Sequence, residues 1–592
     1  MLLFILAGII SFSSISQDNK TIAKLDKELA SLLDDTKTAG YAVAIVKGNK
    51  VIYTKGFGYR DLEGKKKVDE NTLFAIGSSS KAFTTALLGI MEEEKGLSFD
   101  DNPKKYLPEL EFFNDELNSK LTIKDLIGHR TGLPRHDFSW YLFPTKSKDS
   151  LMMRIKYHEP FAGVREYWYY NNFMYLTQGL IAEKLTGKTW EENVRERFFS
   201  PLDMNRSNTS LGEWLKNSNS SLGYKLVDNK EIVKTDYFDI AGMSPAGSIN
   251  SSVSEMSNWL LAWINNGKYN GKQVIPEKYV QQAIQPQMIM SGLKDPEMPS
   301  QHLSSYAYAW MVSSYKGHYR VEHGGNIDGF SANVCFFPTD SIGIVVLTNQ
   351  DGSSLPSLAR NTISDYLLNV ERTDWGARYL KQIESLDAAK VSETDKEKDK
   401  VGSSAHGFHE YEGRYAHKGY GTFTIELKND SLFAQFPVLR MYLKPFNHDI
   451  FEPFIYKNGK IDASDIISIK FNFASDDLGE ISSANLKLEP TLEEPITFKR
   501  TLKTTKIDKA LLSGYAGKYE LSGMKLTIRS DESNNLYLFV PGQPEYTLLP
   551  TSETVFVLKD LNGYKVEFKK GDDGKINMSL IQPNGTFTAV KD

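Results

Sequence analysis

The sequence contains a single cysteine, Cys335, so no disulfide bond can form within the chain. Because Cys335 stands in an apolar run typical of a strand, we expect it to be a small core residue. The chain also lacks a basic excess: 70 Lys and Arg residues are outweighed by 75 Asp and Glu residues. This charge balance gives no indication of a nucleic-acid partner.

Long hydrophobic runs are absent after the first residues of the chain. Residues 1–10 form an apolar run too short to span a bilayer comfortably, and small residues as far as Ser16 precede a polar stretch. We therefore expect residues 1–16 to be a signal peptide, which makes the protein secreted or periplasmic, with no membrane span once the signal is removed. The run has no Lys or Arg at its front, and an uncleaved anchor is the alternative.

Two patterns that would indicate other hydrolases are also missing. The sequence has no Gly-x-Ser-x-Gly, the nucleophile elbow of α/β-hydrolases, and no His-Glu-x-x-His, a zinc-binding pattern. We expect neither a metal site nor a cofactor. With 592 residues, of which 40% are hydrophobic, the chain is long enough for three or four soluble globular domains.

What the sequence does contain is a serine followed three residues later by a lysine, at Ser78 and Lys81, where a turn at Gly77 opens a predicted helix. Apolar residues recur behind this pair at helical spacing, namely Phe83, Leu87, Ile90 and Met91. The spacing puts the hydroxyl and the amine on one face of the helix. A buried lysine loses part of its preference for the charged form, so it can accept the proton of the serine.

The same Ser-x-x-Lys spacing occurs at three other places, Ser291/Lys294, Ser313/Lys316 and Ser522/Lys525. Only Ser78 lies at a turn-to-helix junction with an apolar stripe behind it. Taken alone, a polar N-cap followed by a solvated lysine is the more ordinary interpretation of such a pair. Further motifs have to decide between the two.

Two later stretches carry further polar groups. Tyr170 and Asn172 stand where a turn enters a predicted helix, and an aromatic-rich helix start with an Asn cap would explain them without any chemistry. His323 is followed by Gly324 and Gly325, and such paired glycines indicate backbone that approaches another group closely. The alternative for His323 is a turn at the end of a strand.

Patterns of secondary structure divide the chain. Residues 41–46 and 51–53 predict a hairpin, and residues 333–337 and 342–347 predict two further antiparallel strands. Charge rises and the apolar pattern fades from residue 374 to about 407, which predicts a linker.

Beyond this linker the sequence repeats itself loosely. The segment Tyr411-Glu412-Gly413-Arg414-Tyr415 in the first copy corresponds to Tyr515-Ala516-Gly517-Lys518-Tyr519 in the second. Both copies consist of short alternating strands between Asn, Asp and Gly turns. We therefore predict two small antiparallel β-barrels.

Three motifs together, Ser78-Ser79-Ser80-Lys81, Tyr170-Asn171-Asn172 and His323-Gly324-Gly325, resemble those of the serine β-lactamase and penicillin-recognising hydrolase family. The likeness is nearest to its class C-like branch, which includes D-aminopeptidases and esterases. The two C-terminal copies resemble the lipocalin-like β modules appended to such hydrolases. The expected domains are a signal peptide (1–16), a hydrolase domain (24–370), a linker (371–408) and two β-barrel modules (409–500 and 511–592).

The resemblance implies an α/β (α+β) fold, in which an antiparallel sheet made from both ends of the domain is flanked by helices and lies beside a mostly helical subdomain. It also implies roles for the residues of the motifs. Ser78 would attack an acyl carbon, with Lys81 and Tyr170 as the paired base, and the sequence leaves open which of the two removes the proton. The substrate would be bound by Asn172, His323, Gly325 and Asn326. The backbone N–H groups of Ser78 and Asn326 would hold the oxyanion.

His323 departs from the pattern of this family. Classical β-lactamases and D,D-peptidases usually carry Lys-Thr-Gly at that place, whereas a histidine is mostly neutral at pH 7. We therefore predict a secreted serine hydrolase that acts through a covalent acyl-enzyme on a small peptide, amide or ester. The alternatives are a β-lactamase or D,D-carboxypeptidase and, from another class, a non-catalytic receptor for cell-wall peptide whose contacts come from the β modules.

Overall fold

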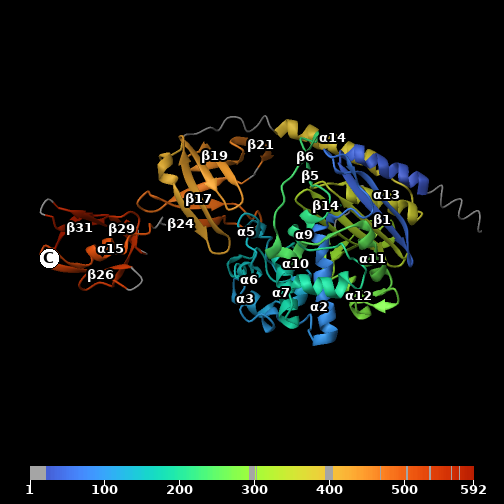
Figure 1. The fold of residues 1–592 in the computed structure, drawn as a ribbon, viewed down its shortest axis with the longest axis horizontal. Coiled ribbons are helices and arrows are strands. Elements are labelled where there is room, and N and C mark those ends of the chain that lie inside the picture. Colours follow the sequence, from blue (N-terminus) through green and yellow to red (C-terminus); the bar gives the residue numbers. More distant parts are fainter. Residues whose placement is uncertain are drawn as a thin grey trace, which may run out of the picture.

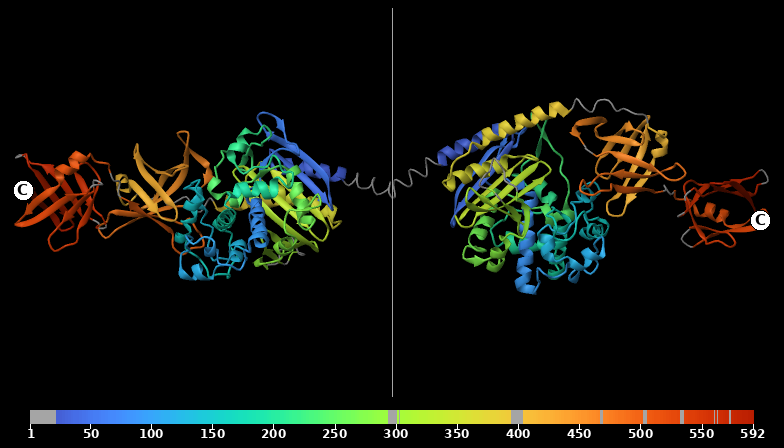
Figure 2. Two further views of the ribbon diagram at one scale, coloured as in Figure 1. Left: turned by 60° about the horizontal axis from the view of Figure 1, so that its bottom comes forward. Right: turned by 180° about the vertical axis from the view of Figure 1, so that it is seen from behind.

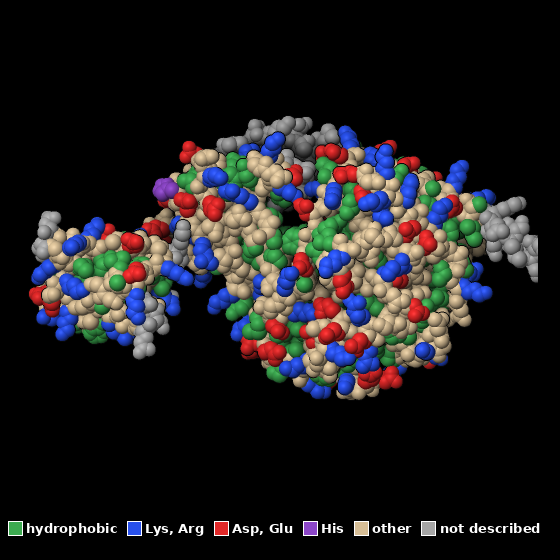
Figure 3. Space-filling model, in the orientation of Figure 1, with side chains coloured by type: hydrophobic (Ala, Val, Ile, Leu, Met, Phe, Trp, Pro, Cys, Tyr) green, Lys and Arg blue, Asp and Glu red, His purple; other side chains and the backbone are tan. Residues whose placement is uncertain are grey.

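The computed structural model (Figure 1) describes residues 22–592 apart from 293–300, 302, 394–403, 467–468, 502–504, 532–534, 560, 562 and 572–573. The predicted signal peptide lies outside the described residues. Among the helices that are described, none combines the length and the apolar character needed to cross a membrane. Basic and acidic side chains are interspersed over the face shown in Figure 3, as the small net charge leads one to expect.

A nine-stranded antiparallel sheet organises the first part of the chain, with strand order β10-β11-β12-β13-β14-β15-β1-β2-β3. Strand β1 pairs with β15, so the two ends of the domain meet in the middle of the sheet, as predicted. The predicted hairpin is formed by β1 and β2. The strands are β1 Gly40–Lys47, β2 Lys50–Asp61, β3 Lys66–Lys67, β10 Met288–Ser291, β11 Ser304–Tyr306, β12 Met311–Tyr315, β13 His318–Ile327, β14 Phe330–Phe337 and β15 Ile342–Thr348.

The central strand β1 is buried on both faces. Successive side chains of a strand point to opposite faces, and here Ala42 and Ala44 belong to one hydrophobic core while Val43 and Ile45 belong to a second. The sheet is therefore the middle layer between two groups of helices. Cys335 on β14 is fully buried in the second core, as the apolar run around it predicts.

The second core is covered by the helix of residues 22–36, by α13 (Leu355–Leu367) and by α14 (Trp375–Glu393). Figure 2 shows α14 continuing roughly in line with the N-terminal helix, and Gly376 at the start of α14 lies next to Asp35 near the end of that helix. Part of the segment predicted to be a linker is thus helical, because Trp375 anchors it: the indole is buried and its Nε1 donates a hydrogen bond to Asp365 Oδ2 over 3.0 Å. The charge pattern of the predicted linker indicated a solvated segment and gave no sign that Trp375 would be buried.

The other face of the sheet carries the larger core and a mostly helical subdomain. Three short two-stranded sheets accompany it, formed by β4 (Phe74–Ala75) with β7 (Asn250–Ser251), β5 (Tyr224–Val227) with β6 (Glu231–Lys234), and β8 (Lys268–Tyr269) with β9 (Lys272–Gln273). The helices are α2 Lys81–Lys95, α3 Asp115–Lys120, α4 Ile123–Ile127, α5 Asp137–Tyr141, α6 Lys148–Met152, α7 Phe173–Thr186, α8 Trp190–Val194, α9 Leu211–Lys216, α10 Ser244–Gly247, α11 Val253–Ile264 and α12 Glu277–Ala283.

Two closed eight-stranded antiparallel barrels follow (Figure 1). In the first barrel β19 pairs with β20 to close the ring, and β21 pairs with β20 as an additional strand. Its strands are β16 Gly413–His417, β17 Gly421–Lys428, β18 Ser431–Gln435, β19 Arg440–Asn447, β20 Ile450–Lys457, β21 Lys460–Ile466, β22 Phe471–Ser475, β23 Ile481–Leu486 and β24 Ile496–Thr501. The second barrel, preceded by α15 Lys509–Tyr515, consists of β25 Gly517–Leu521, β26 Met524–Ser530, β27 Leu536–Phe539, β28 Tyr546–Pro550, β29 Val555–Leu558, β30 Lys565–Lys570, β31 Ile576–Gln582 and β32 Gly585–Lys591.

The two barrels begin in the same way. The Tyr415 hydroxyl donates to the carbonyl of Tyr411 over 2.8 Å, and the Tyr519 hydroxyl donates to the carbonyl of Tyr515 over 2.7 Å. The loose sequence repeat therefore corresponds to a repeated structure, as predicted. In both copies the second tyrosine ties the first strand to the segment that enters the barrel.

Candidate active site

Ser78 lies in a short 3₁₀ turn, Gly77–Ser80, that leads directly into α2. Gly77 has a φ of +50°, a conformation that glycine adopts without strain. Two of the three serines in the turn have structural partners: the Ser79 hydroxyl donates to the His323 carbonyl, and Ser80 Oγ accepts the backbone N–H of Ile249. Ser78 is the partly exposed serine of the three, so it is the one that a substrate can reach.

Lys81 is fully buried beneath Ser78. Its Nζ lies 3.0 Å from Ser78 Oγ, 2.7 Å from Asn172 Oδ1 and 2.7 Å from the carbonyl oxygen of Ala246. Burial holds the pKa of the amine well below its ordinary value of 10.5, the nearby charge of Arg135 lowers it further, and Asp137 opposes both. The predicted proximity of hydroxyl and amine is therefore present.

Asn172 is placed by the start of α7. The sequence left open that Asn172 caps this helix. The side chain that caps it is that of Asn171, whose Oδ1 accepts the backbone N–H of Met174 over 3.3 Å. This leaves the Asn172 side chain for other contacts. Its Oδ1 accepts from Lys81, and its Nδ2 donates to Asp137 Oδ1 over 2.8 Å. Because a carboxylate only accepts, Asp137 fixes which way the amide points.

Tyr170 faces the same group of residues. Lys81 Nζ lies 4.8 Å from the centre of its ring, and the ring centre of His323 lies 6.2 Å away. Burial raises the pKa of the phenol strongly, against a smaller lowering by Ser78. Among the described residues the buried hydroxyl has no hydrogen-bond partner of ordinary geometry, so it is available to a bound molecule.

His323 lies within β13 rather than at a strand end, and its side chain is buried. Burial is the largest of the causes that lower the pKa of the imidazole to about 3, so the ring is neutral. Nδ1 lies 2.5 Å from the carbonyl oxygen of Gly324, which only accepts, so the single proton belongs on Nδ1. Nε2 then accepts from the Tyr306 hydroxyl over 3.0 Å. His323 is a neutral, oriented group at this site.

The glycines allow the Ser78 turn and β13 to touch. A Cβ on Gly325 would lie 1.9 Å from the carbonyl oxygen of Ile76 and 3.1 Å from the backbone nitrogen of Ser78. A Cβ on Gly77 would lie 2.9 Å from the backbone nitrogen of Asn326. The close approach expected from the glycine pair is thus present, at Gly325. It brings the backbone N–H groups of Ser78 and Asn326 to one side of the site.

The side chain of Asn326 holds the end of β13 in place. Its Nδ2 donates to Asp351 Oδ1 over 2.8 Å, and its Oδ1 accepts from the Ser331 hydroxyl and from the Gly352 N–H. The contacts with Asp351 and Gly352 bind β13 to the residues that follow β15, and the contact with Ser331 binds it to β14. What Asn326 offers to a substrate is therefore its backbone.

Sequence reasoning missed Arg135 and Asp137. Arg135 Nε donates to Asp137 Oδ2 over 2.6 Å, and its guanidinium carbon lies 5.0 Å from the centre of the Tyr170 ring. The available signal was a pair of opposite charges shortly after Gly132-Leu133-Pro134. Nothing in that spacing indicated that they would meet Tyr170 and Asn172, which lie more than thirty residues further along.

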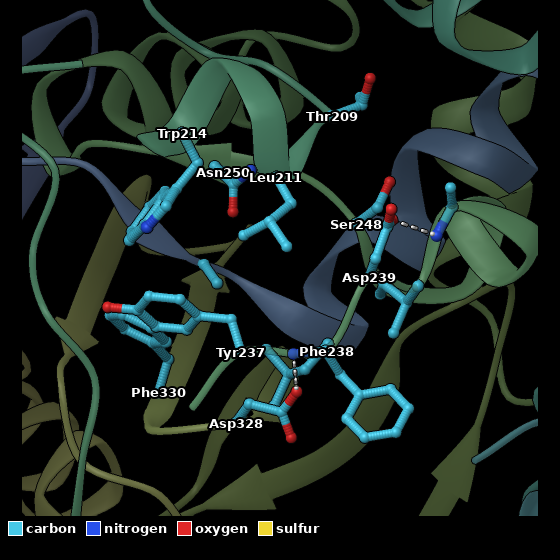
Figure 4. A pocket seen from close by; sticks show the side chains of 15 residues that line it. Thr209, Leu211, Trp214, Tyr237, Phe238, Asp239, Ser248, Asn250, Asp328 and Phe330 are labelled. Atoms are coloured by element: carbon cyan, nitrogen blue, oxygen red, sulfur yellow. Dashed lines mark hydrogen bonds between the residues drawn. The ribbon is translucent and has the colours of Figure 1, made fainter. Parts of the chain in front are cut away.

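A pocket of about 490 Å³, its open mouth included, adjoins the Ser78 turn. It reaches Ala75 and Gly247 on one side and Ile327, the residue after Asn326, on the other. Figure 4 shows aromatic side chains forming much of its wall, and Leu211 of α9 reaches in among them. The aromatic residues are Trp214, Tyr237, Phe238 and Phe330.

Asp328 lies at the edge of this pocket (Figure 4). Burial raises the pKa of its carboxyl group. One oxygen accepts the backbone N–H of Phe238 over 2.9 Å, and the other accepts from the Tyr141 hydroxyl over 3.3 Å. Both oxygens of Asp328 therefore have partners, and the aromatic walls suit an apolar group.

Comparison with known proteins supports these observations. A family model described as Beta-lactamase matches residues 25–366, more than half of the chain. A second model, described as a domain of unknown function (DUF3471), matches residues 397–500, which include the first barrel. Among solved structures, the octameric penicillin-binding protein homologue from Pyrococcus abyssi is similar in fold, with a TM-score of 0.53 at 21% identity over 81% of this chain and 100% of that chain.

Curated relatives are distant. Protein flp of Staphylococcus aureus (strain N315) is 25% identical over 374 residues, which are 62% of this chain and 70% of that protein. Unguisins hydrolase ungD' of Aspergillus campestris (strain IBT 28561) is 28% identical over 385 residues, which are 60% of this chain and 68% of that protein. The chain belongs to the Beta-lactamase family and is a serine hydrolase of that family.

Proposed function

We propose that this hydrolase is secreted and acts through a covalent acyl-enzyme at Ser78 on a small peptide, amide or ester. The observation that carries the proposal is the set of three partners around Lys81 Nζ. Two of them are carbonyl oxygens, which only accept. A neutral amine has two N–H groups for these two oxygens, and its lone pair then faces the Ser78 hydroxyl.

This arrangement favours Lys81 over Tyr170 as the base. Burial lowers the pKa of Lys81 and raises that of Tyr170, so the amine gives up its proton more readily than usual and the phenol less readily. In the proposed step Lys81 takes the proton of Ser78 as Oγ bonds to the acyl carbon. The bond to the leaving group then breaks, and the proton passes to the leaving group with the Tyr170 hydroxyl beside it. Water, activated by the same amine, hydrolyses the acyl-enzyme.

The negative charge of the tetrahedral intermediate would be stabilised by the backbone N–H groups of Ser78 and Asn326. Each donor of this kind contributes about 3 to 4 kcal/mol to lowering the barrier in characterised acyl-transfer enzymes. The support for the assignment is the contact between the Ser78 turn and β13, which only glycine at position 325 permits.

We propose amides and esters as substrates ahead of β-lactams. The place usually taken by a permanent cation is held by His323, which is neutral and satisfied by Gly324 and Tyr306. The aromatic pocket, which is lined by Ala75 and Gly247 near the Ser78 turn, suits an apolar acyl group. One curated relative bears the name of a hydrolase, which is compatible with this class of reaction.

The proposal is tested with a fluorophosphonate probe and a substrate panel. Wild-type protein should be labelled, and Ser78→Ala should not. Turnover of D-amino acid amides or p-nitrophenyl esters at rates above that of nitrocefin would support the proposed substrate class, whereas preferred turnover of nitrocefin would identify a β-lactamase. A protein that no acylating probe labels, but that binds peptidoglycan, would be the non-catalytic receptor. Secretion is tested by sequencing the mature N-terminus, which is expected after residue 16.

A further inference from the structure

The first barrel shares a hydrophobic core with the hydrolase domain. Leu142 and Phe143, which follow α5, are buried among the core residues of the barrel. The ring of Phe143 lies 5.5 Å from that of Phe436 and 5.9 Å from that of Phe498. At Gly421 a Cβ would lie 2.5 Å from the Phe143 ring. Such shared burial fixes the barrel against this part of the hydrolase domain rather than leaving it tethered by a linker.

Polar contacts tie the same surfaces together just before α5. The buried ring of His136 is neutral, because burial lowers its pKa to about 4. Its Nε2 donates to the carbonyl of Glu159 over 3.1 Å, so Nδ1 has no proton and accepts from the hydroxyl of Tyr420 in the barrel over 2.8 Å. The Ser139 hydroxyl donates to the carbonyl of Gly419, the residue before Tyr420, over 2.6 Å.

His136 has a backbone conformation that needs such support. Its φ is +50°, in the left-handed region that is unfavourable for a residue with a Cβ. A second barrel residue, Glu489 in the loop after β23, has its carboxylate facing the backbone N–H of His136, which acts to lower the pKa of the carboxyl group. Glu489 is only 3% exposed, and burial followed by the charge of Asp137 raises its pKa to about 7. The barrel thus holds both the side chain and the backbone of His136.

His136 stands between Arg135 and Asp137, the two charged residues that reach the catalytic groups. Asp137 holds the amide of Asn172, and Asn172 holds the amine of Lys81. A connected series of hydrogen bonds and one backbone turn therefore leads from the barrel to the proposed base. The hydrogen bonds in this series each require one orientation of the Asp137 and Asn172 side chains. A shift of the turn at His136 would therefore displace the amine of Lys81.

We infer that the first barrel is a positioning component of the active site: Tyr420 and Glu489 hold the turn at His136, so that Asp137 and Asn172 keep the amine of Lys81 against Ser78. The inference rests on the proposed function, because it concerns the same acylation step. The first barrel thereby contributes to the rate at which Ser78 is acylated.

The decisive variant is Tyr420→Phe in the full chain, which removes one hydroxyl and keeps the ring. Loss of one such hydrogen bond should slow acylation of Ser78 by the fluorophosphonate about fivefold. The KM for a p-nitrophenyl ester should stay within about twofold, because no group that touches substrate has changed. Tyr442→Phe is the matched control: its ring packs on Phe433 of the same barrel, and its rate should equal that of wild type.

Glu489 provides a second and independent pair of variants. Glu489→Ala removes the acceptor of the His136 N–H and should slow acylation, whereas Glu489→Gln keeps an acceptor oxygen and should restore most of the rate. Hydrogen exchange supplies a readout apart from activity: residues 135–142 should exchange faster in Tyr420→Phe and Glu489→Ala than in wild type.

A double-mutant cycle tests whether the contacts act in series. Asp137→Asn and Tyr420→Phe should be non-additive, since both act on Lys81 through Asn172. Additive effects, or wild-type rates and exchange in both Tyr420→Phe and Glu489→Ala, would overturn this inference and leave the hydrolase proposal intact. Failure of the probe to label wild-type protein would overturn the proposed function itself, and this inference with it.

Discussion

The amine of Lys81 and the side-chain oxygen of Asn172 lie 2.7 Å apart, and the amide nitrogen of Asn172 lies 2.8 Å from Asp137. The lysine is therefore held by an amide that is itself held by a carboxylate. In the neutral form that we propose for the amine, this contact uses one N–H of Lys81 and leaves its lone pair for the serine proton. Burial supplies the other requirement, a pKa well below 10.5.

Replacing the lysine should abolish most of the acylation without removing the serine. For Lys81→Met we expect Ser78 to react about 10² to 10⁴ times more slowly with a p-nitrophenyl ester, since a positioned general base contributes a factor of that size. Burst kinetics measure the rate. Lys525→Met is the matched control, because Ser522 and Lys525 have the same spacing at the surface, where the lysine pairs with Asp592. Equal losses in the two variants would be incompatible with the proposed role of Lys81.

Replacement by alanine should have very different effects on kcat at the two glycines that follow His323. Gly325→Ala places a methyl group 1.9 Å from the Ile76 carbonyl, which must push β13 away from the Ser78 turn and separate the two oxyanion donors. We expect kcat to fall about 10² to 10³-fold, the cost of losing one such donor. At Gly324 the nearest atom to an added Cβ is 3.5 Å away, an ordinary contact, so Gly324→Ala should keep kcat near the wild-type value. Similar kcat values for the two variants would count against the oxyanion assignment.

A larger side chain in the aromatic pocket should change which acyl groups are preferred and leave the catalytic groups at Ser78 unaffected. Leu211→Trp puts a larger side chain among the pocket walls, so we expect kcat/KM for a phenylacetyl ester to fall about tenfold relative to that for an acetyl ester. Leu215→Trp on the same helix is the control, because Leu215 is 64% exposed and does not line this pocket. Unchanged relative kcat/KM values in Leu211→Trp would show that the acyl group binds elsewhere.

The sequence predicted those parts of the site that local patterns encode. A serine at a turn-to-helix junction, a tyrosine and an asparagine at a helix start, and a histidine before two glycines each have a signature within a few residues. The resemblance of the three motifs to the β-lactamase family then implied the sheet and its flanking helices. The repeated Tyr-x-Gly-x-Tyr segments similarly predicted the two barrels.

What the sequence could not provide were contacts between distant segments. Asp137 meets Asn172 across a turn whose left-handed residue, His136, is not a glycine and so carries no signal. Glu489 and Tyr420 reach the same turn from a separate barrel, which no periodicity within either domain indicates. The helix α14 falls within the predicted linker, because its anchor is one tryptophan in a charged segment.

The central claim is that Lys81 is a neutral base, and the pH dependence of the Ser78 acylation rate tests it most directly. Because the unprotonated amine is the active form, the burst rate with a p-nitrophenyl ester, corrected with Ser78→Ala, should rise with pH and reach a plateau. The midpoint should lie well below 10.5, and the rise should be absent in Lys81→Met. A midpoint at 10.5 or above, or an identical profile in Lys81→Met, would contradict the account.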